Sequence, residues 1–425
     1  MPAAGTTIRN ATLVLPDRIE RSPLHLSGGW ITAEPPADAW AIDLRDHLIF
    51  PGLINAHDHL HLNNIPRLPQ EEPFPNSYAW ITAFQAYFAN SDVAAAIAVA
   101  KPLRYRQGGL KNLLAGATTV AHHDPWHAAL DEPSFPVRLL RDFGWSHSLG
   151  MGDGGWEMGV GLSQPPSPIP HPLPRYGPPV VESFAATPAH QPWIIHLAEG
   201  TDAISAAELS WLDHLGCLAD NTVLVHGAGL TAADIERVIA RHAAVIWCPS
   251  SNLSMLGRTL DPRRLFDAGR LALGSDSRLS GARDLLDELQ VAAAHSELTP
   301  RELLRLVSSA ARGILRLPEV GGLDAGQRAD LLILRDIGGD PYQCLIDIKR
   351  KDICAVIRGG APMIADRGFA DWFAACHIEA VPALLDGRAK LLSRALARPD
   401  SIALEPGLDI VTRTEERGLR AEGRI

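Results

Sequence analysis

The sequence predicts an α/β fold built on a parallel (β/α)₈ TIM-like barrel. Short apolar segments rich in β-forming residues alternate with helix-forming segments over about 250 residues, the length that such a barrel requires. Several of these apolar segments are followed directly by histidine or aspartate. The chain has 425 residues, 46% hydrophobic and 21% charged, which is enough for a large domain plus a smaller one.

Composition limits the classes of partner. A net charge of −10 argues against nucleic-acid backbones and anionic membranes. The five cysteines are scattered and form no Cys-x-x-Cys pair, which favours a reducing compartment over a disulfide framework or a structural zinc knuckle. The first residues lack a secretion signal, and no apolar run is long enough to span a bilayer. We therefore expect a cytoplasmic protein that acts on a small molecule, without nucleic acid or membrane as a partner.

The first strands lead to a histidine motif. Between residues 6 and 45, short apolar stretches alternate with Gly and Pro turns, which predicts small antiparallel strands. The next apolar segment begins at Leu48 and ends in His57 and His59. Side chains two residues apart in a strand project from the same side, so both imidazoles can bind one divalent ion. A solvated, histidine-rich turn is the alternative for this stretch taken alone.

Helices and strands are predicted to alternate after this motif. The alanine-rich residues 92–114 favour a helix, and residues 117–124 favour a second strand that ends in polar residues. A helix over residues 137–142 then leads to a third strand over residues 145–149. Residues 150–179 contain so many Gly and Pro residues that no fourth strand can be assigned. We therefore expect the barrel to be distorted around strand 4.

The remaining strands of the barrel are more regular. Four short β-type runs, separated by helix-like segments, cover residues 192–196, 222–226, 244–248 and 271–274. Residues 330–334 and 353–357 are predicted to return to short strands. A mostly helical tail is predicted from Phe369 onward.

Five polar residues stand at the same end of four predicted strands. In a parallel barrel, catalytic groups gather at the carboxyl ends of the strands, where the loops open. His196 and His226 end two strands, and Asp276 follows the last one, while His57 and His59 end the first. Each residue alone is explained as a hydrogen-bonded loop residue or a helix cap. The five together predict a metal site.

These segments resemble the amidohydrolase superfamily over nearly the whole chain. The matching segments are Pro51-Gly52-Leu53-Ile54-Asn55-Ala56-His57-Asp58-His59, His196-Leu197-Ala198-Glu199, Val225-His226-Gly227, Cys248-Pro249-Ser250-Ser251-Asn252, Gly274-Ser275-Asp276-Ser277 and Gly322-Leu323-Asp324-Ala325-Gly326-Gln327-Arg328-Ala329-Asp330-Leu331. A histidine followed three residues later by glutamate resembles the mononuclear aminohydrolase branch, which includes guanine, cytosine and S-adenosylhomocysteine deaminases and triazine hydrolases.

The resemblance implies the domain organisation. Residues 51–318 would form the metal-dependent hydrolase barrel. A small β-sandwich would be built from both chain ends, with residues 1–50 as its N-terminal part. Residues 319–425 would supply its C-terminal part and the helical tail. This tail, over residues 369–398, is compatible with a homodimer.

The resemblance also implies the roles of the site residues. One divalent ion per chain, Zn²⁺ or alternatively Fe²⁺, would be bound by His57, His59, His196 and Asp276. Such an ion lowers the pKa of a bound water and generates hydroxide. Asp276 would take the proton of the water, Glu199 would carry a proton to a ring nitrogen of the substrate, and His226 would steer the water or polarise the substrate.

Alternatives remain for several of these residues. A two-metal site usually needs a carbamylated lysine at strand 4, and no lysine occurs between Lys111 and Lys349, although Glu157 could substitute. The zinc deaminase design with His-x-Glu and Pro-Cys-x-x-Cys is absent. A salt-bridged surface position is the alternative for Glu199.

The substrate contacts are the least specific part of the pattern. His122 and His123, at the end of the second strand, are candidate substrate-binding residues, but a capped or hydrogen-bonded histidine pair explains them equally well. Asn252 lies in a loop that we expect beside the pocket. These residues do not identify a substrate.

We therefore expect a metal-dependent hydrolase that acts on a C–N bond other than a peptide bond and deaminates an aminated heterocycle by metal-bound hydroxide. Glu199 favours deamination, since an aromatic amine needs protonation of a ring nitrogen. Hydrolysis of a cyclic amide or ureide, or removal of a halide, are the enzymatic alternatives on the same barrel. A non-catalytic scaffold is the alternative from another class.

Overall fold

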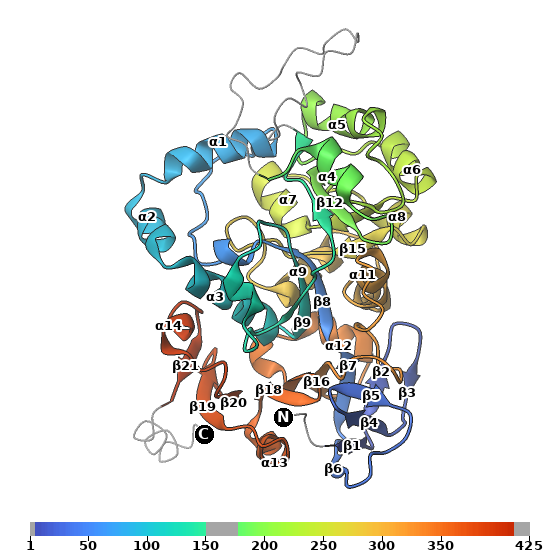
Figure 1. Cartoon of the computed structure of the whole chain (residues 1–425), viewed down its shortest axis with the longest axis vertical. Helices are drawn as coiled ribbons and strands as arrows, with labels where there is room; N and C mark the ends of the chain where they lie inside the picture. The colour runs from blue at the N-terminus through green and yellow to red at the C-terminus, as the bar shows by residue number, and fades with distance from the viewer. Residues whose placement is uncertain (1–4, 150–176, 412–425) are drawn as a thin grey trace.

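The computed structural model describes residues 5–149 and 177–411 (Figure 1). Strands from the two ends of the chain, blue and orange to red, gather in one half of the molecule, and helices with the remaining strands fill the other half. None of the helices in the described ranges combines the length and the apolar character needed to cross a membrane.

Eight strands of the described chain pair in parallel and carry the predicted site residues at their ends. One sheet contains β8 (Leu53–Asp58), β9 (Ala117–His122) and β10 (Arg138–Leu139). The other contains β11 (Gly144–Trp145), β12 (Trp193–Leu197), β13 (Thr222–His226), β14 (Ala244–Trp247) and β15 (Leu271–Leu273). The backbone N–H of Asp276 donates to the carbonyl of His57 over 3.0 Å, so the segment after β15 lies beside the end of β8.

Helices flank these strands. They are α1 (Ser77–Tyr87), α2 (Ser91–Ala98), α3 (Lys101–Leu114), α4 (Val180–Ala186), α5 (Ala203–His214), α6 (Ala232–Ala240), α7 (Pro249–Leu256), α8 (Arg263–Asp267), α9 (Leu285–Ala294), α10 (Pro300–Leu306) and α11 (Ser309–Ile314). Capping boxes at Thr231 and Thr299 fix the first turns of α6 and α10. Gly108 lets α3 pack closely under the site, because a Cβ there would overlap the carbonyl of Leu60.

Two further sheets contain the strands from the chain ends. The first has the order β5-β4-β1-β6 and uses β1 (Thr6–Arg9), β4 (Leu24–Ser27), β5 (Trp30–Thr32) and β6 (Trp40–Asp43). The second has the order β21-β19-β20-β18-β17-β16-β7-β2-β3. Its strands are β2 (Thr12–Val14), β3 (Ile19–Glu20), β7 (His47–Pro51), β16 (Leu331–Arg335), β17 (Ala355–Arg358), β18 (Ala361–Ala365), β19 (Ala380–Leu385), β20 (Arg388–Ser393) and β21 (Leu408–Ile410). Buried residues of both sheets, such as Ile8 and Ile333, share one hydrophobic cluster.

The second of these sheets contains both parallel and antiparallel pairs and is called the mixed sheet below. At Gly52 the chain passes from this mixed sheet to the parallel strands. On one side β7 pairs with β16 and β2, and on the other β8 pairs with β9. The N–H of Gly52 donates to the carbonyl of Asp330 over 2.7 Å, and a Cβ at Gly52 would overlap the side chain of Thr118. The strand that carries the two histidines is therefore anchored in both parts of the fold.

Two predictions about secondary structure are wrong. Residues 137–142 do not form a helix but contain β10, and the third predicted strand begins earlier, as β11 at Gly144. The strand that could not be assigned thus precedes residues 150–176, which lie outside the described residues, as does Glu157. Strands of two residues are too short to show an alternation of apolar and polar positions, so the pattern could not reveal them.

The helical tail is the second error. After α12 (Pro341–Asp347), the only helices described from residue 369 onward are the short α13 (Ala370–Ala375) and α14 (Pro399–Ile402), and between them the chain forms the β19–β20 hairpin. Alternate residues of β19 are buried, which is the period of a strand with one face on the core. The alanine and leucine content of this region favoured a helix, and the pairing of β20 with β18 within the second sheet decided otherwise.

Candidate metal centre and active site

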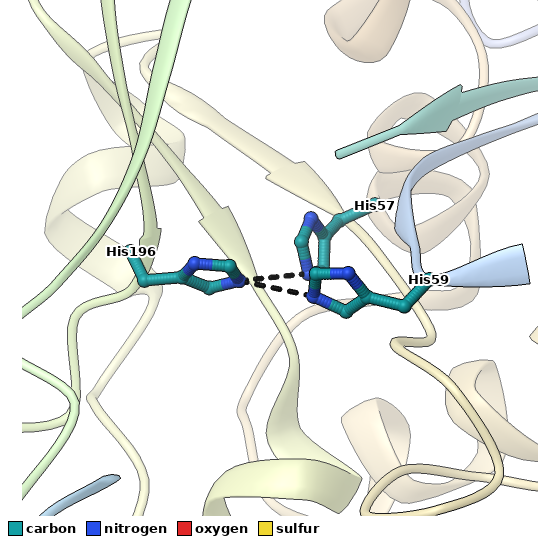
Figure 2. Close-up of side chains that lie close together, drawn as sticks. All are labelled: His57, His59 and His196. Carbon is teal, nitrogen blue, oxygen red and sulfur yellow. Dashed lines mark hydrogen bonds between the residues drawn. The ribbon is translucent and has the colours of Figure 1, made fainter. Parts of the chain in front are cut away.

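Three imidazoles converge where β8 and β12 end (Figure 2). Nε2 of His196 lies 3.4 Å from Nε2 of His57 and 3.2 Å from Nε2 of His59, and all three side chains are buried. Ligand nitrogens held 2.0–2.1 Å from a tetrahedral Zn²⁺ lie about 3.3 Å apart. The spacing and the chemistry of these donors therefore fit a single divalent ion.

Asp276 supplies a carboxylate beside these imidazoles. Its Oδ1 lies 3.9 Å from Nε2 of His57, while its Oδ2 accepts hydrogen bonds from the hydroxyls of Ser251 and Ser280 at 2.8 and 2.7 Å. Burial acts to raise the pKa of Asp276, but the neighbouring histidines, first of all His59, and the hydroxyl donors lower it to about 2. The carboxylate is thus ionised and oriented with Oδ1 toward the cluster.

Hydrogen bonds on the second ring nitrogen orient two of the histidines. Nδ1 of His59 lies 2.6 Å from a carboxylate oxygen of Asp124, and Nδ1 of His196 lies 2.8 Å from the carbonyl oxygen of His147. When Nδ1–H donates, Nε2 is left as the lone-pair donor for a metal. No role was predicted for Asp124 from the sequence. Its position at the polar end of the second strand was the only feature that indicated one.

Glu199 and His226 lie together beside the metal candidate. Nε2 of His226 is 3.3 Å from Oε1 of Glu199, and Nδ1 of His226 is 2.9 Å from the side-chain oxygen of Asn252. Only 9% of Glu199 is exposed, which excludes the alternative of a surface salt bridge. Burial, with a further contribution from Asp276, raises the pKa of Glu199 to about 7. This carboxyl can therefore hold a proton near neutral pH.

The backbone at three strand ends adopts an uncommon conformation. Ala198, His226 and Asp276 have φ angles of 52°, 78° and 54°, in the left-handed region that side chains bearing a Cβ rarely adopt. Such conformations persist only where the surroundings hold them, and they turn the chain sharply at the end of each strand. The turns bring residues from different strands into the same small volume.

A buried ion pair lies beneath the histidines. Nζ of Lys111, on α3, lies 3.1 Å from the carboxylate of Asp58, and neither side chain has exposed surface. The same ammonium group donates to the carbonyl of Asp276 over 2.7 Å and to the hydroxyl of Ser275 over 3.2 Å. Lys111 therefore links the strand end that carries His57 and His59 to the segment that carries Asp276.

A cavity of about 380 Å³ opens onto these groups. Its polar residues include His59, His196, Glu199, His226 and Asp276, and its apolar residues include Trp80, Ile81, Phe84, Met255 and Leu279. Of the predicted site residues, the structure thus brings the metal and catalytic candidates together at one cavity.

The three predicted substrate contacts lie beside the site but outside the described lining of the cavity. Nδ1 of His122 is 3.2 Å from the carbonyl oxygen of Asp58, and Nε2 of His123 is 3.0 Å from the carbonyl oxygen of Ser146. Both histidines are fully buried, and Asn252 is engaged with His226. Among the described residues, none of the three belongs to the cavity lining. His122 and His123 therefore match the alternative given above, a hydrogen-bonded histidine pair.

Comparisons with known proteins relate this chain to hydrolases of one family. The model of the amidohydrolase family matches residues 175–362. The 5-methylthioadenosine/S-adenosylhomocysteine deaminase of Halobacterium salinarum is 25% identical over 350 residues, which cover 71% of this chain and 76% of that protein. The chain is therefore similar to amidohydrolases over much of its length.

Solved structures of similar fold extend over most of this chain. Atrazine chlorohydrolase from Arthrobacter aurescens TC1, complexed with zinc, superposes with a TM-score of 0.66 and 21% identity, covering 87% of this chain and 100% of that one. An adenosine deaminase from Xanthomonas campestris with bound zinc gives a TM-score of 0.64 and 20% identity, covering 89% and 98%. At these identities the likeness concerns the fold.

Purified protein is expected to contain about one Zn²⁺ or Fe²⁺ per chain, because the cluster offers one set of imidazole and carboxylate donors. Elemental analysis measures this content. The double substitution His57→Ala, His59→Ala should abolish it, whereas replacing the exposed His190 and His214 with alanine should not. Full metal occupancy in the first double variant would contradict the assignment.

Lys111→Met is expected to lower the free energy of unfolding by about 3–5 kcal/mol, because it leaves a buried carboxylate without its counter-ion. Urea unfolding at equal metal content measures this difference. The matched control is Lys349→Met: Lys349 pairs with Asp287 at 3.0 Å but is half exposed, and its loss should cost less than about 1 kcal/mol. Equal effects of the two substitutions would refute the importance of the buried pair.

Proposed function

We propose that this protein releases ammonia from an aminated heterocycle by metal-dependent hydrolysis of a C–N bond. The observation that carries the proposal is Glu199, a buried carboxyl with a pKa raised to about 7 that lies beside a cluster of three imidazoles and one carboxylate. A proton donor in that place is what an aromatic amine needs. The relative from Halobacterium salinarum, named as a deaminase, supports the same reaction class.

His57, His59, His196 and Asp276 would hold the ion. Imidazole and carboxylate donors suit a borderline divalent cation, and the zinc in the solved structures of similar fold supports Zn²⁺ ahead of Fe²⁺. When bound, the ion acts as a Lewis acid that activates water and compensates developing negative charge. The remaining chemistry belongs to the side chains.

Asp276 is the proton acceptor in this proposal. Two hydroxyls, of Ser251 and Ser280, occupy its Oδ2. Its Oδ1 accepts the backbone N–H of Ser277 over 2.6 Å and lies nearest His57, so Oδ1 is the oxygen placed to take a proton from the attacking water. His226 orients that water or the substrate through Nε2, since Asn252 binds its Nδ1. The low pKa of Asp276 keeps it ionised in the resting state.

Glu199 moves the other protons. Its protonated carboxyl donates to a ring nitrogen as the water oxygen bonds to the adjacent carbon. The carboxyl then receives the proton that Asp276 took, and it gives a proton to the exocyclic amine. As the C–N bond breaks, the hydroxyl group that came from water gives its remaining proton back to Glu199, and the products are ammonia and an oxo-substituted ring. One molecule of water is consumed, so atoms and charges balance.

Parts of the architecture belong to the same proposal. We propose that the eight parallel strands close into the (β/α)₈ barrel of residues 51–318, and that residues 1–50 and 319–425 form one β-sandwich. The hydrogen bond from Asp276 to the carbonyl of His57 and the shared hydrophobic cluster of the end sheets support this. The cytoplasmic location, the homodimer and the lack of nucleic-acid or membrane partners stay predictions.

The proposed reaction is tested by screening aminated purines, pyrimidines, triazines and pterins against the zinc-loaded protein. On any substrate found, free ammonia should accompany a product in which an amino group is replaced by a hydroxyl or oxo group. Mass spectrometry and an ammonia assay measure both. Ring opening with all nitrogen retained, or release of halide in place of ammonia, would contradict deamination.

Asp276→Asn and Glu199→Gln are expected to differ. The first removes a metal-binding charge and the proton acceptor, so metal content and turnover should both fall. The second should keep the metal and lose at least about 100-fold in kcat, the usual size of a general acid–base contribution. Equal loss of metal in both variants would show that Glu199 is itself a ligand.

The pH profile should report Glu199. Because the proposed role needs the protonated carboxyl, kcat/KM should fall as the pH rises through the pKa, which is about 7 in the structure and lower beside a bound cation. Rate profiles between acidic and alkaline pH measure this limb. The residual activity of Glu199→Gln should lack it, and an unchanged limb in that variant would assign the titration to another group.

A further inference from the structure

We infer that the substrate carries an apolar, uncharged substituent beside its aminated ring, and that Trp80 and Phe84 select it. This inference rests on the proposed function, since it concerns the substrate of the same site. Two independent observations lead to it, the aromatic surface of α1 and the absence of arginine and lysine from the described lining of the cavity.

An aromatic surface forms the apolar side of the cavity. Trp80 and Phe84, one helical turn apart on α1, stack with ring centroids 5.2 Å apart and planes inclined by 9°. Phe88, one turn further, packs edge-on against Phe84 at 4.8 Å and 77°, and 44% of it is exposed. Together with Ile81, all three belong to the cavity lining. The helix therefore presents a continuous aromatic face from the cavity to the solvent.

The position of this helix is tied to the catalytic strand end. Asn76 caps α1 and donates to the carboxylate of Asp202 over 2.6 Å, and the N–H of Ser77 donates to the carbonyl of Glu199 over 2.9 Å. Tyr78 donates from its hydroxyl to Glu208, which in turn accepts from the N–H of Ala198. The aromatic face is thus held at a defined place beside the proton donor.

The charge of the cavity excludes one kind of substituent. Within the described ranges, neither arginine nor lysine lines the cavity, and its carboxylates are Asp124, Glu199 and Asp276. A substrate with a carboxylate or phosphate would lose its hydration without gaining an arginine or lysine partner and would face these three carboxylates, which is unfavourable. An apolar or aryl group placed on Trp80 and Phe84 gains buried area and aromatic contacts.

The relative from Halobacterium salinarum is named after two compounds that differ in this respect. 5-Methylthioadenosine ends in an apolar methylthio group, whereas S-adenosylhomocysteine ends in a zwitterionic amino acid. For this chain the cavity favours the first type of substituent. The substrate screen has to identify the heterocycle, because stacking on the aromatic face does not distinguish one ring from another.

Equilibrium binding to zinc-loaded protein tests the inference with two matched pairs of probes. The first pair is amino-anilino-s-triazine and its carboxyanilino analogue, and the second is 5-methylthioadenosine and S-adenosylhomocysteine. In at least one pair, the apolar member should bind about tenfold more tightly than the charged member, a difference typical of one well-placed group. Equal binding within both pairs, tighter binding of the charged members, or no binding of either apolar member would overturn the inference.

Substitutions separate selection from structure. Trp80→Ala and Phe84→Ala should each reduce the preference for the apolar member at least severalfold while metal content stays at one ion per chain, and Trp80→Phe should restore most of it. Trp126→Ala is the matched control, because Trp126 is 38% exposed and lies outside the cavity lining. A preference that persists in both alanine variants would show that α1 does not select the substituent.

The two proposals fail in different ways. If the apolar members bind preferentially but no ammonia is released from any screened amine, the deaminase proposal fails and the substituent preference stands. If ammonia is released with equal kcat/KM from the apolar and charged members of a pair, the preference fails and the deaminase proposal stands.

Discussion

The site depends on a buried ion pair that lies outside the described lining of the cavity. Asp58 stands between His57 and His59, and because alternate residues of a strand face opposite sides, its carboxylate points away from both imidazoles. There it meets the ammonium group of Lys111, with no exposed surface on either side chain. In such surroundings an unpaired charge is strongly unfavourable. The pair therefore fixes the orientation of β8, and with it the two histidines.

The same ammonium group acts on the opposite strand end. By donating to the carbonyl of Asp276, Lys111 supports a residue whose φ of 54° would otherwise be strained. Hydrogen bonds then complete the positions of the other donors, with Asp124 behind His59 and the carbonyl of His147 behind His196. The chemistry of these two imidazoles is thus set by a partner on the second ring nitrogen, which decides the nitrogen that faces the cluster.

The cavity combines two surfaces of different character. Strand ends supply the imidazoles and carboxylates, and the helix α1 supplies stacked aromatic rings. This division separates the reaction from the choice of substrate, because the strand ends are constrained by the buried pair and by one another, whereas α1 follows a loop. A loop-borne helix can change its side chains without disturbing the metal cluster.

Much of the cluster was predictable from the sequence, because parallel strands place their carboxyl ends on one face and each apolar run is followed by its polar residue. The structure brings His57, His59, His196, His226 and Asp276 together, and Glu199 with them. The strands β12 to β15 were equally visible, since buried parallel strands have continuous apolar runs.

Only the tertiary structure determined the hydrogen-bonding partners of the site residues and the elements that surround the site. Asp124 and His59 are 65 residues apart, and Lys111 and Asp276 are 165 apart, so no local pattern links them. The strand β10 has two residues and no readable period. The β19–β20 hairpin is favoured by its pairing with β18 in the sheet that it extends, against its alanine and leucine content. Sequence determines the periodicity and the residue that ends each strand, whereas contacts between distant segments depend on how complete elements pack.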